Sequence, residues 1–163
     1  MERLPSILVS VLLLLAVAVV VGPFLPELAG VGSHGNATVT VSNGSDTLAV
    51  VDARVADSPQ ERYRGLSGTD PLENDTGMLF VFPDESNVSF VMRGMNYPLD
   101  MVFIDAEGNI TTVYTVPVPP ENASESELER YPGRAKWVLE VPAGWAERHG
   151  VSPGDTVEIG GSA

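Results

Sequence analysis

The chain has 163 residues, of which 9 are Lys or Arg and 22 are Asp or Glu, so its formal net charge is −13 at pH 7. This length allows one domain of ordinary size with an appendage. The absence of cysteine excludes disulfide frameworks, zinc ribbons, iron–sulfur clusters and thiol catalysis. The acidic balance excludes nucleic acid as an expected partner, because duplex binding depends on Lys and Arg neutralising phosphates.

The few basic residues are nearly all arginine, and Lys136 is the only lysine. Excess carboxylate with almost no lysine is typical of proteins that work in molar salt, where screening removes the self-repulsion of the surface. The composition therefore favours a halophilic source. An ordinary acidic surface domain is the alternative.

The N-terminal stretch 4–25 contains no charged residue and is long enough to span a hydrocarbon core of about 30 Å as a helix. The positive-inside rule places the N-terminus in the cytoplasm only weakly, because Arg3 is offset by Glu2. A cleaved signal peptide with small residues at 29–32 is the alternative. The predicted organisation is a transmembrane signal anchor over 1–25, a flexible tether over 26–36 and an extracytoplasmic domain over 37–163.

Six Asn-x-Ser/Thr sequons follow this segment and support export, since each is a candidate acceptor for an N-linked glycan. Turn chemistry enriches the same residue types, so we expect only a subset to be used. The six are Asn36, Asn43, Asn74, Asn87, Asn109 and Asn122. Asn43 and Asn122 are favoured because their sequence context is a turn or a loop.

Beyond the tether the pattern predicts mainly β-strands. Residues 38–42 and 47–55 alternate or are rich in β-branched residues around an Asn43-Gly44 turn, which indicates a hairpin. Ser58-Pro59-Gln60-Glu61 is a capping box with proline at the first helical position, so a short helix should run to about Gly65. Further strands are predicted over 78–82, 88–92, 99–104, 110–116, 137–141 and 156–159.

The later part of the chain adds two brief helical signals. A Pro- and Glu-rich excursion over 117–133 contains a second capping box at Ser124 and Glu127. A short helix should span 143–149, with Gly150 just beyond its end. The expected fold is therefore mainly β: a small closed or partly closed β-barrel with two or three short helices, preceded by one N-terminal transmembrane helix.

Residues 62–157 resemble domain of unknown function 192, a family also described as membrane-associated and uncharacterised. The matching segments, in chain order, are 64–66, 77–82, 90–93, 98–105, 138–141 and 143–144. Gly154, Asp155 and Val157 complete the match. Val91 and Arg93 stand where the family commonly has Trp and Lys, and Gly94-Met95 where it commonly has Asn-Thr. The resemblance implies a compact, mainly β domain that is often exported or membrane-tethered, and it implies no activity.

The candidate binding residues lie on both sides of the loop 94–98. Arg93 ends an apolar strand and Asp100 begins the next, so we expect the two to pair, either as a structural brace or at a ligand site. At a ligand site, Arg64 and Arg93 would present guanidinium groups to a small anionic or sugar ligand, with Asp100 and Asp105 orienting it. Trp137 would line the same pocket.

Catalysis is not favoured by these residues. The sequence has no Gly-x-Ser-x-Gly or Ser-x-x-Lys motif and no glycine-rich phosphate loop. Asp100 and Asp105 are an odd number of residues apart on one predicted strand and should face opposite ways, which disfavours a pair of catalytic carboxylates. Asp155 is expected to cap its own Pro-Gly-Asp turn.

The predicted function is a membrane-anchored extracytoplasmic binding or envelope-associated module without a cofactor or a metal. The alternative is a small enzyme that acts on carbohydrate or another cell-envelope polymer, with Arg93 and Asp100 at its site. Partner proteins are not indicated by the sequence.

Overall fold

The computed structural model describes residues 35–161. The predicted membrane anchor over 1–25 lies outside the described residues, as does nearly all of the predicted tether. Among the residues described, no helix combines the length and the apolar character needed to cross a membrane.

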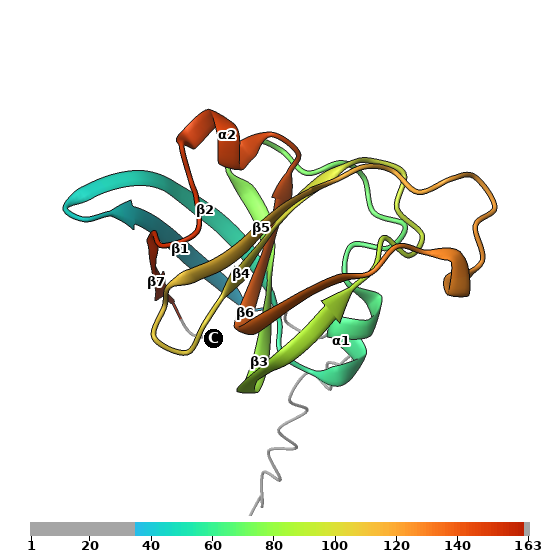
Figure 1. Ribbon diagram of the computed structural model, residues 1–163, viewed down its shortest axis with the longest axis horizontal. Coiled ribbons are helices and arrows are strands. Elements are labelled where there is room, and N and C mark those ends of the chain that lie inside the picture. Colours follow the sequence, from blue (N-terminus) through green and yellow to red (C-terminus); the bar gives the residue numbers. More distant parts are fainter. Residues whose placement is uncertain (1–34, 162–163) are drawn as a thin grey trace, which may run out of the picture. The chain divides into compact units, whose positions relative to one another are not determined.

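The described residues form a mainly β domain with few helices, as predicted (Figure 1). The strands are β1 (Asn36–Asn43), β2 (Asp46–Ala56), β3 (Thr76–Phe90), β4 (Leu99–Ile104), β5 (Ile110–Val116), β6 (Tyr131–Pro142) and β7 (Thr156–Gly160). The helices are α1 (Pro59–Arg64), α2 (Trp145–His149) and one turn of 3-10 helix, η1 (Glu125–Glu127).

All strands belong to one sheet, in the order β5-β4-β6-β3-β2-β1-β7. Neighbours are antiparallel except β2 and β3, which run parallel and are connected through α1. The strands predicted over 78–82 and 88–92 fall in the one longer strand β3, which ends at Phe90, and the strand predicted over 137–141 lies within β6. These two strands pair on both sides of an irregularity between Val81 and Ser86.

The predicted closed or partly closed barrel is not a closed barrel, because the strands form one open sheet. Asn109, just before the edge strand β5, forms an isolated bridge with Thr156 of the other edge strand β7, and β5 and β7 are not paired in a continuous ladder. Short strands with tight turns occur both in barrels and in strongly curved open sheets, so the sequence pattern does not distinguish the two.

The capping box at the start of α1 is confirmed. Glu61 N donates to Ser58 Oγ, while the Glu61 carboxylate accepts from Ser58 N at 3.0 Å and from Ser58 Oγ at 2.7 Å. These hydrogen bonds lower the pKa of Glu61 to about 2, because they stabilise the charged carboxylate. Gly65 ends the helix at a φ of 51°, a value that favours glycine. The helix thus starts and stops at fixed residues.

Buried side chains form two clusters on opposite faces of the central strands. The α2-side core contains Val39, Val51, Leu139, Val141 and Trp145, with other small apolar residues of β1 and β2. The α1-side core contains Leu66, Met78, Phe80, Met92, Met101, Phe103 and Val138. Successive residues of β6 alternate between the two cores, as the period of a strand requires. Each residue of a central strand is thereby assigned to one face.

A row of edge-to-face aromatic rings runs through the α1-side core. Ring centroids are 4.9 Å apart for Phe80 and Phe90, 5.8 Å for Phe90 and Phe103, and 5.7 Å for Phe103 and Tyr114. Such pairs contribute roughly 0.5–1.5 kcal/mol each beyond the area that they bury. The row makes this side of the sheet a rigid aromatic wall.

Candidate ligand-binding pocket

A pocket of about 480 Å³ opens on the α1 side of the sheet. Residues from α1, β3, the segment 91–95 and β6 line it. Its walls are mainly apolar and include Leu66, Phe80, Phe82, Phe90 and Met92. This volume falls within the range of roughly 300–1,000 Å³ typical of small-molecule sites.

Glu140 forms the inner end of this pocket. In β6 it lies directly opposite Met78 of β3 and Met101 of β4, and residues opposite each other in antiparallel strands share a face. Its side chain therefore lies on the face of the α1-side core, where the residue is only 5% exposed and lines the cavity. A carboxyl group thus faces the cavity from among buried methionines.

The environment of this carboxyl raises its pKa to about 8. Desolvation by burial is the cause, and no hydrogen bond or charge from the described residues offsets it. At neutral pH the group is mainly a neutral carboxylic acid, which can donate one hydrogen bond and accept others. The pocket therefore contains a largely buried carboxyl that makes no hydrogen bond to the described residues.

Arginines surround the mouth of the pocket. Arg62 donates to the carbonyl of Val81 at 2.8 Å and lies 5.2 Å from the Phe82 ring centroid. Arg64, in the last turn of α1, is exposed. Arg93, just after β3, is the third arginine of the lining. Among the described lining residues Glu140 is the one carboxyl, and the lining contains three arginines.

Arg93 is held in place by two partners. Its Nη1 donates to the carbonyl of Tyr63 at 3.1 Å and its guanidinium lies 4.2 Å from the Tyr63 ring centroid. Its Nη2 forms an ion pair with Glu125 at 2.5 Å, a hydrogen bond that raises the pKa of Arg93. The Arg93 Nε is buried and has no hydrogen-bond partner among the described residues.

The predicted pair of Arg93 with Asp100 is wrong. Asp100 is fully buried, and its carboxylate accepts from Thr115 Oγ1 at 2.8 Å, Gly144 N at 3.1 Å and Ala146 N at 2.8 Å. The reason is the strand period: Met101 faces the α1-side core, so the preceding residue faces the other side of the sheet. Asp100 holds the start of α2.

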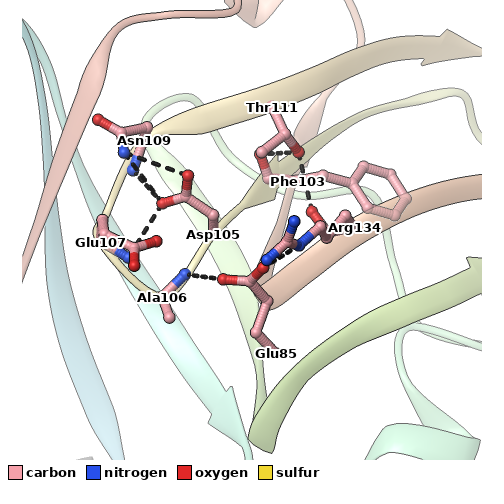
Figure 2. Close-up of polar contacts among 8 residues, drawn as sticks. All are labelled: Glu85, Phe103, Asp105, Ala106, Glu107, Asn109, Thr111 and Arg134. Atoms are coloured by element: carbon pink, nitrogen blue, oxygen red, sulfur yellow. Dashed lines mark hydrogen bonds and ion pairs between the residues drawn. The ribbon is translucent and has the colours of Figure 1, made fainter.

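Asp105 and Trp137 also lie outside the pocket lining. Asp105 Oδ1 accepts from Glu107 N at 3.0 Å and from Asn109 N at 2.8 Å, so its carboxylate organises the turn between β4 and β5 (Figure 2). In the same view Glu85 accepts from Ala106 N at 2.7 Å and pairs with Arg134.

Trp137 packs half-buried against the α2-side core. It is an odd number of residues from Glu140 along β6, so the two side chains lie on opposite faces. Of the five predicted ligand residues, the structure thus brings Arg64 and Arg93 to the pocket and places Asp100, Asp105 and Trp137 elsewhere.

Glu140 was missed as a site residue by the analysis of the sequence. The available signal was one acidic residue inside the apolar strand segment 138–141. A charged residue on the same strand face as a core valine is uncommon unless it is paired or functional. The identity of the face, however, follows only from the pairing of β6 with its neighbours.

The sequons differ in how their amides are used. Asn43 Nδ2 donates to Asp155 Oδ1 at 2.6 Å, and Asn109 Nδ2 donates to both carboxylate oxygens of Asp105 at 3.1–3.2 Å. The exposed sequon asparagines are Asn36, Asn43, Asn74, Asn87 and Asn122. Asp155 also accepts from Ser152 N at 2.7 Å, which confirms the predicted turn cap.

Comparisons with known proteins extend over nearly the whole described domain. The model of the family DUF192, uncharacterized ACR, matches residues 39–159. No curated protein matches the chain significantly.

Two crystal structures are similar to the domain. The first is a protein of Sinorhizobium meliloti 1021 provisionally described as a transcription regulator; it has a TM-score of 0.68 and 32% identity, over 77% of this chain and 95% of that one. The second is a protein of unknown function from Novosphingobium aromaticivorans DSM 12444, with a TM-score of 0.62 and 29% identity, over 74% of this chain and 83% of that one. Because the S. meliloti chain is matched over 95% of its length, a chain with little beyond this domain folds on its own.

Proposed function

This chain belongs to the DUF192 family, and from that premise we propose that its domain is a non-catalytic module that binds a small anionic ligand in the pocket beside α1. The observation that carries the proposal is Arg93, which lines an aromatic-walled cavity with Arg62 and Arg64 and whose Nε has no hydrogen-bond partner among the described residues. Guanidinium groups suit carboxylates and other planar anions because they offer several donors in a fixed geometry.

The geometry of the mouth gives the anion a specific place. Each terminal nitrogen of Arg93 uses one of its two N–H groups, one with Tyr63 and the other with Glu125, so a second N–H on each nitrogen remains for an anion. Arg64 is exposed on the neighbouring helix and supplies a second positive charge at the same pocket. A ligand carboxylate would therefore lie at the mouth, with the rest of the ligand against the aromatic wall.

An enzyme acting on carbohydrate is less well supported by this pocket. Glycoside hydrolysis uses two carboxyl groups that flank the bond to be cleaved. Among the described residues that line the pocket, Glu140 is the one carboxyl, and Asp100 lies on the other face of the sheet. Binding without catalysis is therefore the function that we favour.

The module is held at the membrane by residues 1–25, with its domain outside the cytoplasm of a halophilic cell. The uncharged stretch 4–25 and the six sequons support this location, and the net charge of −13 with one lysine supports the halophilic setting. We do not extend the description of the S. meliloti protein as a transcription regulator to this chain. The net charge of −13 opposes binding to DNA.

The location is tested with the full chain in its host. The chain should sediment with membranes, and protease added to intact cells should digest the domain. A domain that is protected in intact cells and is cleaved only after lysis would contradict the outward orientation.

The binding function is tested on residues 35–163 by calorimetric titration with a panel of carboxylates and sugar acids in high salt. At least one should bind, and Arg93→Ala should weaken it at least about tenfold, since a charge-assisted hydrogen bond contributes roughly 1.5–3 kcal/mol. Arg54→Ala is the matched control, because Arg54 is exposed on β2 and does not line the pocket. Equal losses in both variants, or no binding at all, would refute the proposal.

A further inference from the structure

The inner end of the pocket specifies the ligand more closely than the arginines at its mouth do. Glu140 is 5% exposed, lines the cavity, and lies opposite two buried methionines. The described residues make no hydrogen bond to its carboxyl, so the available partner is a polar atom inside the cavity, from water or from a ligand that displaces water.

Resting on the proposed function, we propose that the ligand is an amphipathic carboxylate: an apolar, ring-like body that carries an uncharged hydroxyl at the end opposite its carboxylate. The carboxylate binds at Arg93 and Arg64, the body lies against Phe80, Phe82 and Phe90, and the hydroxyl pairs with Glu140. Each part of the ligand thus has a counterpart among the residues that line the pocket.

The choice of a hydroxyl follows from the state of Glu140. Burial holds the carboxyl mainly neutral at pH 7, so it both donates and accepts a hydrogen bond, as a hydroxyl does. A cationic group would suit only the ionised form, and Arg62 and Arg64 in the pocket lining oppose the entry of cations. A purely apolar end would leave Glu140 without a partner in the complex.

The aromatic wall explains why the ligand body is flat. Phe80 and Phe90 stand edge to face at 4.9 Å, and Phe82 and Phe90 do so at 6.3 Å. Their faces and edges offer a ring the offset and T-shaped contacts that aromatic groups prefer. A flat ring between the mouth and Glu140 therefore fits the pocket better than a polar sugar ring.

The test compares three probes that share one body: 3-phenylpropanoate, 3-(4-hydroxyphenyl)propanoate and 3-(4-(aminomethyl)phenyl)propanoate. Each is titrated calorimetrically into residues 35–163 in high salt at about pH 6.5. The hydroxylated probe should bind at least about tenfold more tightly than 3-phenylpropanoate, because a site that hydrogen-bonds a hydroxyl discriminates strongly against its absence.

Two variants assign this preference to Glu140. Glu140→Gln keeps a group that donates and accepts, so the preference should persist, whereas Glu140→Leu should abolish it. If Glu140→Leu does not fold, Glu140→Met replaces it, since methionines already flank this position. Arg93→Ala should weaken the first two probes by the same factor.

The outcomes separate this inference from the proposed function. Equal binding of the first two probes, a preference that survives in Glu140→Leu or Glu140→Met, or tightest binding of the amine would overturn the inference while leaving an anion-binding pocket. Failure of all three probes to bind at concentrations up to about 10 mM would overturn both.

Discussion

Replacing the buried carboxyl of Glu140 should change how the stability of the domain depends on pH. Glu140→Gln retains the shape and the hydrogen-bonding capacity of the side chain and removes its charge. Burial raises the pKa of this carboxyl in the folded state from 4.5 to about 8. As pH rises through 4.5 the unfolded chain releases the proton, while the folded domain keeps it until about pH 8.

The sign of the effect follows from this difference in bound protons. Between pH 4.5 and 8 the folded state binds the extra proton, so the free energy of unfolding falls as pH rises. One pH unit corresponds to about 1.4 kcal/mol. The wild type should therefore lose about 3 kcal/mol between pH 5 and 7 through this group, and Glu140→Gln should not.

The measurement is denaturant unfolding of residues 35–163 at about pH 5, 7 and 8.5 in one fixed high-salt buffer. The difference in unfolding free energy between Glu140→Gln and wild type should grow with pH in favour of the variant. Glu158→Gln is the matched control, since Glu158 is an exposed glutamate of β7. A constant difference between Glu140→Gln and wild type across this range would show that the Glu140 carboxyl is not held neutral by burial.

Three further predictions concern the stability and the modification of the domain. Asp100→Ala should destabilise it by about 3 kcal/mol in denaturant unfolding, because three donors at Thr115 and the start of α2 lose their acceptor; a loss no larger than that of Arg93→Ala would contradict this role. The melting temperature should rise as KCl increases from about 0.1 M to molar concentrations, through screening of the −13 net charge; a flat or falling curve would count against adaptation to salt. Peptide mass spectrometry of protein from the native host should find a glycan on at least one exposed asparagine whose amide makes no hydrogen bond in the described domain, and bare polypeptide at every one of these positions would refute this. These asparagines are Asn36, Asn74, Asn87 and Asn122.

Local features of the fold were predictable from the sequence because they depend on neighbouring residues. The capping box at Ser58, the end of α1 at Gly65 and the turn cap of Asp155 each require residues within about four positions of one another. Strand β4 matches its predicted bounds of 99–104, since an apolar run between turn residues defines both ends.

Features that depend on distant pairing were not predictable in this way. The sequence placed Asp100 close to Arg93, but the register of β4 against β6 assigns it to the other face, where α2 supplies its partners. The open sheet likewise depends on how far β7 extends along β5. Glu140 stands out only when Met78 and Met101 are known to lie beside it. The pairing register of the strands, and not the residue type, determines on which face Asp100 and Glu140 lie.

A crystal structure of residues 35–163 grown in high salt with 3-(4-hydroxyphenyl)propanoate tests the pocket most directly. We expect density beside α1, with the carboxylate within hydrogen-bond distance of the terminal nitrogens of Arg93 and the ring against Phe80, Phe82 and Phe90. Density elsewhere, such as beside Trp137, or an empty pocket at a saturating concentration of the probe would contradict the assignment of this cavity as the ligand site.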